Sequence, residues 1–281
     1  MIPLHDDNPT AIRPVVTWGL IGGCVLVYLW QFSLTGGAGQ EAVYGLGLIP
    51  AVLFGERALP PDVEMVPAFA TLFTSMFMHG GLLHVSGNML YLWIFGNNVE
   101  DAMGHGRFAA FYVVCGLAAA LAHALYDPAS TVPMVGASGA IGGVLGAYLL
   151  LHPKARILVL IPVFIFPYFV RVPAAFVLGL WFVLQIVNTT LFSDSGGGGV
   201  AYLAHIGGFV AGALLILVMR KQGVLLFDRG RLEAIAAHQV PRLPWVERRY
   251  PVRVRPSAEK DRGPKTRGPH GPWDPRSGPW G

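Results

Sequence analysis

Long apolar segments follow one another along the first 220 residues and set the expected architecture. They cover approximately residues 15–34, 79–98, 107–126, 138–152, 173–191 and 200–219. Most of them approach the roughly 20 residues that a helix needs to cross a bilayer. The pattern predicts an all-α membrane protein with six transmembrane helices. We expect a short segment at 1–12, one membrane domain at 13–220 and a separate tail at 221–281.

A further apolar stretch at 156–170 leaves two alternatives open. It contains Pro162 and Pro167 and is flanked by Arg156 and Arg171. A seventh span is one alternative. A re-entrant or interfacial segment is favoured, because the stretch is short and prolines interrupt helices.

Composition agrees with a membrane protein. The chain is 53% hydrophobic and only 13% charged, whereas a typical soluble domain is about 25% charged. Its mean hydropathy of +0.53 excludes a water-soluble globular domain. Cys24 and Cys115 both fall inside apolar segments, so we expect small packing residues and neither a disulfide nor a metal site.

The distribution of Lys and Arg predicts the orientation. The part from Arg220 onward holds 14 of the 20 Lys and Arg residues. Basic loops face the cytoplasm, so both termini are expected there, in a bacterial inner membrane. Residues 225–240 are interpreted as a short interfacial helix, and the Pro- and Gly-rich remainder as disordered. The basic tail either contacts anionic lipid headgroups or is simply solvated; no nucleic-acid partner is expected.

Polar residues in three of the apolar segments suggest a common site, because polar groups inside a membrane are costly. With a helical rise of about 1.5 Å per residue, four of them lie roughly 18–24 Å above the cytoplasmic helix ends. That level is about 6–12 Å below the outer surface of a 30 Å hydrocarbon core. The four are His84, Asn88, Ser138 and His205.

These residue types favour nucleophilic catalysis. A serine hydroxyl needs an adjacent base to become a nucleophile, and His205 is the candidate base for Ser138. Residues 128–193 contain no Asp or Glu, so we predict a dyad without a third carboxylate. His84 and Asn88, four residues apart, suit an oxyanion hole together with the Ser138 backbone N–H.

The neighbours of these residues have supporting roles. Gly136 and Gly139 flank Ser138 and leave room for a substrate backbone and a sharp entry into the helix. His79 is expected to make a structural hydrogen bond near the outer end of its helix. Small residues along the fourth and sixth segments favour close helix packing.

Other intramembrane chemistries fit less well. A zinc protease requires His-Glu-x-x-His, but His84 is followed by Val85. An aspartyl protease requires two intramembrane carboxylates; Asp127 could supply one, but no second carboxylate lies within a predicted span. A small-solute transporter is expected to carry coupling charges at the midplane, and none is visible.

The motifs, taken together, resemble those of the rhomboid intramembrane serine proteases. The resemblance covers residues 72–219 and rests on His79-x4-His84-x3-Asn88, Gly136-Ala-Ser138-Gly139 and Ala204-His205-x-Gly207-Gly208. It implies a six-helix rhomboid-like bundle and Ser138 as nucleophile. His205 is then the base, with His84 and Asn88 as oxyanion stabilisers. It also implies transmembrane protein substrates, cut near the outer face, and no cofactor.

Two departures accompany the resemblance. Many members have an aromatic residue four positions after the nucleophile, stacked on the catalytic histidine, where this chain has Gly142. A Trp-Arg pair in the first outer loop is absent, and Arg57 is the only basic residue there. The alternative function is a non-catalytic relative that binds membrane helices, although members of that kind typically lack the Ser or the His.

Overall fold

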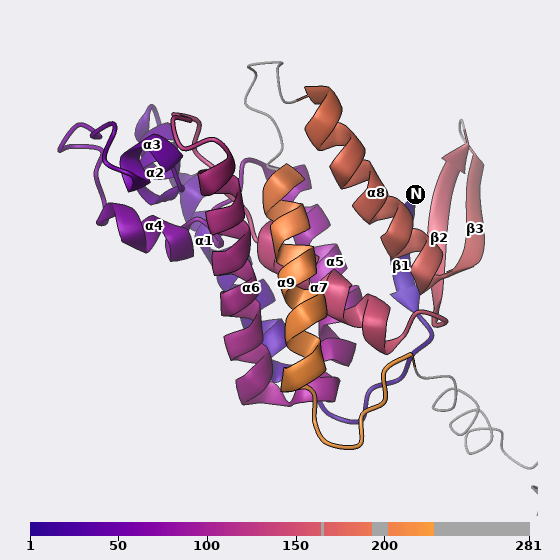
Figure 1. Ribbon diagram of the computed structural model, residues 1–281. Coiled ribbons are helices and arrows are strands. Elements are labelled where there is room, and N and C mark those ends of the chain that lie inside the picture. The colour runs from indigo at the N-terminus through magenta and orange to yellow at the C-terminus, as the bar shows by residue number, and fades with distance from the viewer. Residues whose placement is uncertain (164–165, 193–201, 228–281) are drawn as a thin grey trace, which may run out of the picture. The chain divides into compact units, whose positions relative to one another are not determined.

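The computed structural model describes residues 1–163, 166–192 and 202–227, and the described part is mostly helical (Figure 1). The helices and strands, in chain order, are β1 (Ile2–Asp6), α1 (Val15–Ser33), α2 (Ala38–Leu46), α3 (Pro50–Leu53), η1 (Ala68–Ala70), α4 (Thr71–Thr74), α5 (Leu82–Met103), α6 (His105–Tyr126), α7 (Ser138–Leu151), β2 (Arg156–Val163), β3 (Phe166–Pro173), α8 (Ala174–Phe192) and α9 (Tyr202–Met219). The predicted interfacial helix and the disordered tail lie almost wholly outside the described residues.

Each of the six apolar segments is helical, as α1 and α5–α9. Three of these helices, α1, α6 and α9, are long and apolar enough to cross a membrane by length and composition. Helix α7 and the apolar part of α8 are shorter. Helix α5 has 22 residues, but it starts at Leu82 and not at residue 79 as expected, after Gly80 and Gly81.

Helices α7 and α9 lie side by side (Figure 1). They approach so closely that side chains are excluded from much of their contact. A Cβ added to Gly208 would overlap the carbonyl oxygen of Gly139, and one added to Gly212 would overlap that of Gly143. On α7, a Cβ at Gly146 would overlap the carbonyl oxygen of Phe209. The predicted small-residue packing between these helices is therefore what the structure has, and glycine is needed for it.

A buried carboxylate joins α1, α5 and α6 at one end. Glu100 is fully buried and accepts hydrogen bonds from the backbone N–H groups of Val16 and Thr17, at 3.0 and 2.8 Å, and from the Thr17 hydroxyl at 2.7 Å. Its other neighbour is His105 Nδ1, at 2.6 Å. The two backbone N–H groups belong to the first turn of α1 and have no partner within that helix. Glu100, which lies on α5, therefore caps the start of α1.

The described residues of the segment 156–170 do not form a seventh spanning helix, and its re-entrant or interfacial position in the membrane stays a prediction. It folds as an antiparallel hairpin of β2 and β3, and β1 pairs with the other edge of β2. Its Ile, Val, Phe and Tyr residues favour strands, and prolines oppose a helix. Pro162 is tolerated because it lies beyond Leu160, the last residue of β2 that pairs with β1.

The N-terminal strand is tied to the helical bundle through one buried hydrogen bond. The hydroxyl of Tyr148, in α7, donates to Asp6 Oδ2 at 2.7 Å. Asp6 is 4% exposed. Burial raises the pKa of its carboxyl from 3.8 to about 6, against the opposing effect of the Tyr148 hydrogen bond.

We predict that Gly208→Ala destabilises the bundle by about 1–3 kcal/mol, because its new methyl group overlaps α7 and the two helices must separate. Gly19→Ala is the matched control, since nothing lies within 4 Å of the added Cβ. The measurement is thermal unfolding in detergent. A control that loses as much stability as Gly208→Ala would contradict this account of the contact.

We also predict that docking of β1 weakens as pH rises. Because the folded pKa of Asp6 lies above its unfolded value, the stabilisation is complete below about pH 4 and is lost as pH rises through about 6. Asp6→Asn keeps an uncharged acceptor for Tyr148, so it removes this dependence and is more stable than the wild type at pH 7.5. Unfolding midpoints of both proteins at pH 5 and 7.5 provide the test, and parallel pH profiles would refute it.

Candidate functional site

A cavity of about 1110 Å³ opens among α5, α6, α7, α8 and α9 and is bordered by residues 127 to 136. Polar side chains from all five of these helices line it. They include all four residues that the sequence placed at one level, His84, Asn88, Ser138 and His205. The structure thus gathers the candidate residues around a single hollow.

Ser138 and His205 are in direct contact. Ser138 is the first residue of α7, and its hydroxyl oxygen lies 2.8 Å from Nε2 of His205, in the first turn of α9. His205 is 8% exposed, whereas Ser138 is half-buried and faces the cavity. A hydroxyl and an imidazole at this distance have the geometry of a nucleophile and its general base.

Helix α8 contributes two residues to the site that sequence analysis did not identify. Oε1 of Gln185 lies 2.8 Å from Nδ1 of His205, the ring nitrogen that faces away from Ser138. The indole of Trp181 lies against the same imidazole, with ring centroids 5.7 Å apart and an angle of 37° between the rings. The available signal for Gln185 was an amide inside a predicted membrane segment, because buried polar groups need partners.

The aromatic residue missing at position 142 is excluded by packing. A Cβ at Gly142 would lie 2.9 Å from the carbonyl oxygen of His205 and 3.4 Å from the backbone nitrogen of Phe209. No ring fits between α7 and α9 at this point. Trp181 instead supplies the ring from α8, on another side of His205.

His84 and Asn88 lie on α5 across from the start of α7. Nδ1 of His84 accepts a hydrogen bond from the Gly80 N–H at 3.3 Å, which leaves Nε2 directed at Gly136. Asn88 is 8% exposed, and its side-chain nitrogen has no hydrogen-bond partner among the described residues. A buried amide donor without a partner is uncommon, and this one lies on the cavity wall.

Glycine is required at position 136 both by the backbone conformation and by the side chains that lie close to it. Its φ is +129°, a region that residues with a Cβ rarely adopt. A Cβ there would lie 2.8 Å from His84 Nε2 and 3.6 Å from the Asn88 side-chain nitrogen. Its own N–H donates to the Ser75 carbonyl at 2.9 Å, which fixes the approach to Ser138.

His79 lies before α5 and outside the cavity lining. It is buried, its Nδ1 is 3.1 Å from the Phe77 carbonyl oxygen, and its backbone exchanges hydrogen bonds with the Gln31 side chain of α1. Gly139 packs against Ala119 of α6 and lines the cavity. Both residues position the elements around the site.

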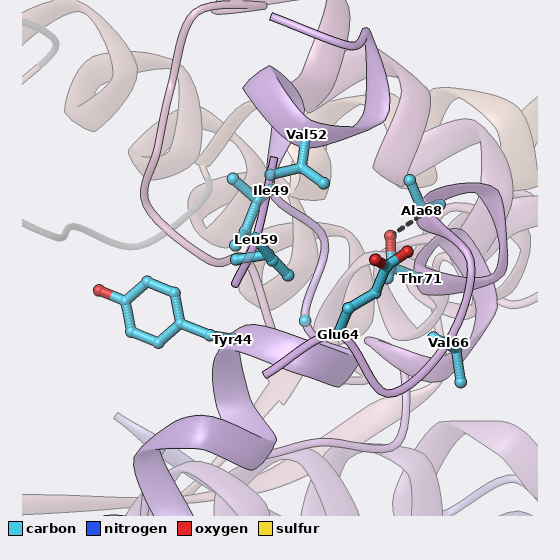
Figure 2. A pocket seen from close by; sticks show the side chains of 9 residues that line it. Tyr44, Ile49, Val52, Leu59, Glu64, Val66, Ala68 and Thr71 are labelled. Atoms are coloured by element: carbon cyan, nitrogen blue, oxygen red, sulfur yellow. Dashed lines mark hydrogen bonds between the residues drawn. The ribbon is translucent and has the colours of Figure 1, made fainter. Parts of the chain in front are cut away.

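A second, much smaller pocket shares no lining residue with this cavity. Figure 2 shows its side chains, which include Tyr44, Leu59, Glu64 and Thr71. Its volume of about 10 Å³ accommodates no more than about one water molecule. Across the described part of the chain, no group of three His, Cys, Asp or Glu residues is arranged to hold a metal ion.

Comparison with known proteins identifies the family. The Rhomboid domain model matches residues 67–222, more than half of the chain. The chain belongs to the rhomboid family. It is accordingly an integral membrane protein.

Several curated relatives are similar over parts of the chain. Rhomboid protein 1, mitochondrial, of Saccharomyces cerevisiae is 31% identical over 180 residues, which are 62% of this chain and 49% of the relative. Rhomboid protease GluP of Bacillus subtilis is 41% identical over 78 residues, 28% of this chain and 15% of the relative. Presenilin-associated rhomboid-like protein, mitochondrial, of Mus musculus is 33% identical over 151 residues, which are 49% of this chain and 40% of the relative. The chain therefore spans half or less of the length of these rhomboid relatives.

We predict that Gly136→Ala lowers the labelling of Ser138 by a fluorophosphonate probe at least about tenfold, because the new methyl group displaces the His84 ring. Gly55→Ala is the control, since Gly55 has a φ of +78° but nothing within 4 Å of its added Cβ. Both variants carry backbone strain of about 1–3 kcal/mol, and only Gly136→Ala alters the site. Equal labelling of the two variants would mean that strain, and not contact with His84, makes glycine necessary.

Proposed function

We propose that this rhomboid protein is an intramembrane serine endopeptidase that hydrolyses peptide bonds in or near transmembrane helices of other membrane proteins. The observation that carries the proposal is the 2.8 Å contact between Ser138 Oγ and His205 Nε2 at the wall of a large cavity. Side chains of this kind, in a mutual hydrogen bond and open to a substrate-sized space, suit acyl transfer.

The reaction proceeds in two steps, acylation of Ser138 and hydrolysis of the acyl-enzyme. His205 Nε2 takes the hydroxyl proton as Ser138 Oγ attacks the carbonyl carbon. The tetrahedral intermediate then collapses, the C–N bond breaks, and His205 returns the proton to the leaving amine. In the second step, water attacks the acyl-enzyme, giving its proton to His205, and the Ser138 hydroxyl is regenerated as the carboxylic product leaves.

Asn88 and His84 stabilise the oxyanion in this scheme. The Asn88 side-chain nitrogen has two N–H groups and no partner among the described residues. Nε2 of His84 and the first backbone N–H groups of α7 are further donors beside Ser138. Preorganised donors of this kind lower the barrier because they need no rearrangement as charge develops.

The proposed setting is a six-span bundle whose basic side is cytoplasmic. The six helices α1 and α5–α9 support the span count, and the distribution of Lys and Arg supports the orientation. We retain 13–220 as the membrane domain and 221–281 as a basic tail that either contacts anionic headgroups or is solvated. The sequence favoured a bacterial inner membrane, but two of the three relatives are mitochondrial by name, and a test in liposomes is independent of the membrane of origin.

The competing function is that of a non-catalytic membrane-helix binder. One relative is named a protease, and the other two names state no activity. An intact Ser–His pair favours catalysis, because binding alone does not require it. The two functions differ in whether Ser138 reacts.

We expect the purified protein in liposomes to cleave a model transmembrane substrate, and both Ser138→Ala and His205→Ala to lose cleavage by a factor of at least about 10³. Asn88→Ala is expected to lower kcat about 10²–10³-fold with little change in KM, because its contact forms in the transition state. Leu82→Ala is the matched control on α5, since Leu82 is 66% exposed and does not line the cavity.

Equal cleavage by the wild type and both variants would identify a contaminating protease and refute the site. Failure of the folded wild type to cleave or to react with a fluorophosphonate would favour the helix-binding function.

A further inference from the structure

The imidazole of His205 is held on both of its nitrogen atoms. Nε2 contacts Ser138 Oγ, and Nδ1 contacts Gln185 Oε1, each at 2.8 Å. Gln185 is 7% exposed and His205 is 8% exposed. This chain of three side chains crosses from α8 through α9 to α7, and its Gln185 and His205 members are buried.

The orientation of the Gln185 amide is fixed by its second hydrogen bond. Its Nε2 donates to the carbonyl oxygen of Trp181, one turn earlier in α8, at 3.3 Å. A carbonyl oxygen only accepts, so the amide nitrogen must face Trp181. The amide oxygen therefore faces His205, which excludes the flipped assignment.

An acceptor opposite Nδ1 determines where the imidazole proton resides. Oε1 of Gln185 carries no hydrogen, so the contact is a hydrogen bond only if Nδ1 is protonated. In the neutral ring, Nε2 is then unprotonated and accepts the Ser138 hydroxyl proton. The opposite tautomer would place two acceptors against each other at Nδ1 and leave Ser138 without its base.

We infer that Gln185 is the positioning residue for His205 and takes the place of the third group of a catalytic triad. It holds the tautomer in which Nε2 is a base, and its amide dipole stabilises the imidazolium formed during attack. Trp181 confines the ring from the side. The inference rests on the proposed function for its catalytic consequence, but the tautomer is a property of the resting protein.

Two substitutions of Gln185 distinguish the effect of its acceptor oxygen from the effect of its packing. Gln185→Met keeps an unbranched side chain of similar length but removes the acceptor oxygen. Gln185→Glu keeps an acceptor oxygen at the same position. Val183→Ala is the control on the same helix, because Val183 is 52% exposed and makes no contact with the site.

The test uses the full chain in nanodiscs, labelled with ¹⁵N-histidine, and the His205→Ala variant assigns the His205 signals. Ring nitrogen shifts are expected to show Nδ1–H in the wild type, in Gln185→Glu and in Val183→Ala, and a mixture of tautomers in Gln185→Met. Cleavage kinetics are expected to show a loss in kcat of about 10–100-fold for Gln185→Met with KM within about twofold. Gln185→Glu is expected to recover most of the wild-type kcat.

Two results would overturn the inference. One is a wild-type His205 protonated on Nε2, a measurement that requires no variant to fold. The other is a Gln185→Met protein with unchanged tautomer and unchanged kcat. If the tautomer responds as expected and the wild type cleaves nothing, the positioning role stands and the proposed protease function fails.

Discussion

The backbone contact between α7 and α9 is the constraint on which the site depends. The two helices meet where Gly139 and Gly143 face Gly208 and Gly212, so their backbones are nearly in van der Waals contact. Ser138 begins one helix and His205 lies one turn above this contact on the other. A hydroxyl and an imidazole are short side chains, and they reach 2.8 Å only because no larger side chain separates the helices.

The same contact determines how His205 is oriented. No aromatic ring fits at Gly142, so both the ring that lies against His205 and the Nδ1 partner come from α8, as Trp181 and Gln185. A neutral amide suits a buried position in an apolar helix, because an ionised carboxylate there would cost several kcal/mol in desolvation. The amide also satisfies its own donor within α8, so the partner of His205 introduces no unpaired group.

Much of the site could be predicted from the sequence, because its residues share short motifs and a common depth. Ser138, His205, His84 and Asn88 all line one cavity. Gln185 was missed because no motif marks it among the other polar residues near the end of α8, Asn188, Thr189 and Thr190. The β-sheet was missed for a different reason: an apolar run gives no clear period, and β1 pairs with a strand about 150 residues later, which local patterns do not report.

The proposed nucleophile, Ser138, and the proposed base, His205, are held by different parts of the fold. Helix α7 is buried along most of its length and is fixed at three points: Gly136 bonds to Ser75 before it, glycines pack on α9, and Tyr148 bonds to Asp6. The His205 ring depends on α8, whose other face carries exposed apolar side chains such as Phe176 and Leu184. The contacts that orient the His205 ring therefore come from α8, whereas those that fix Ser138 come from α7 and its neighbours.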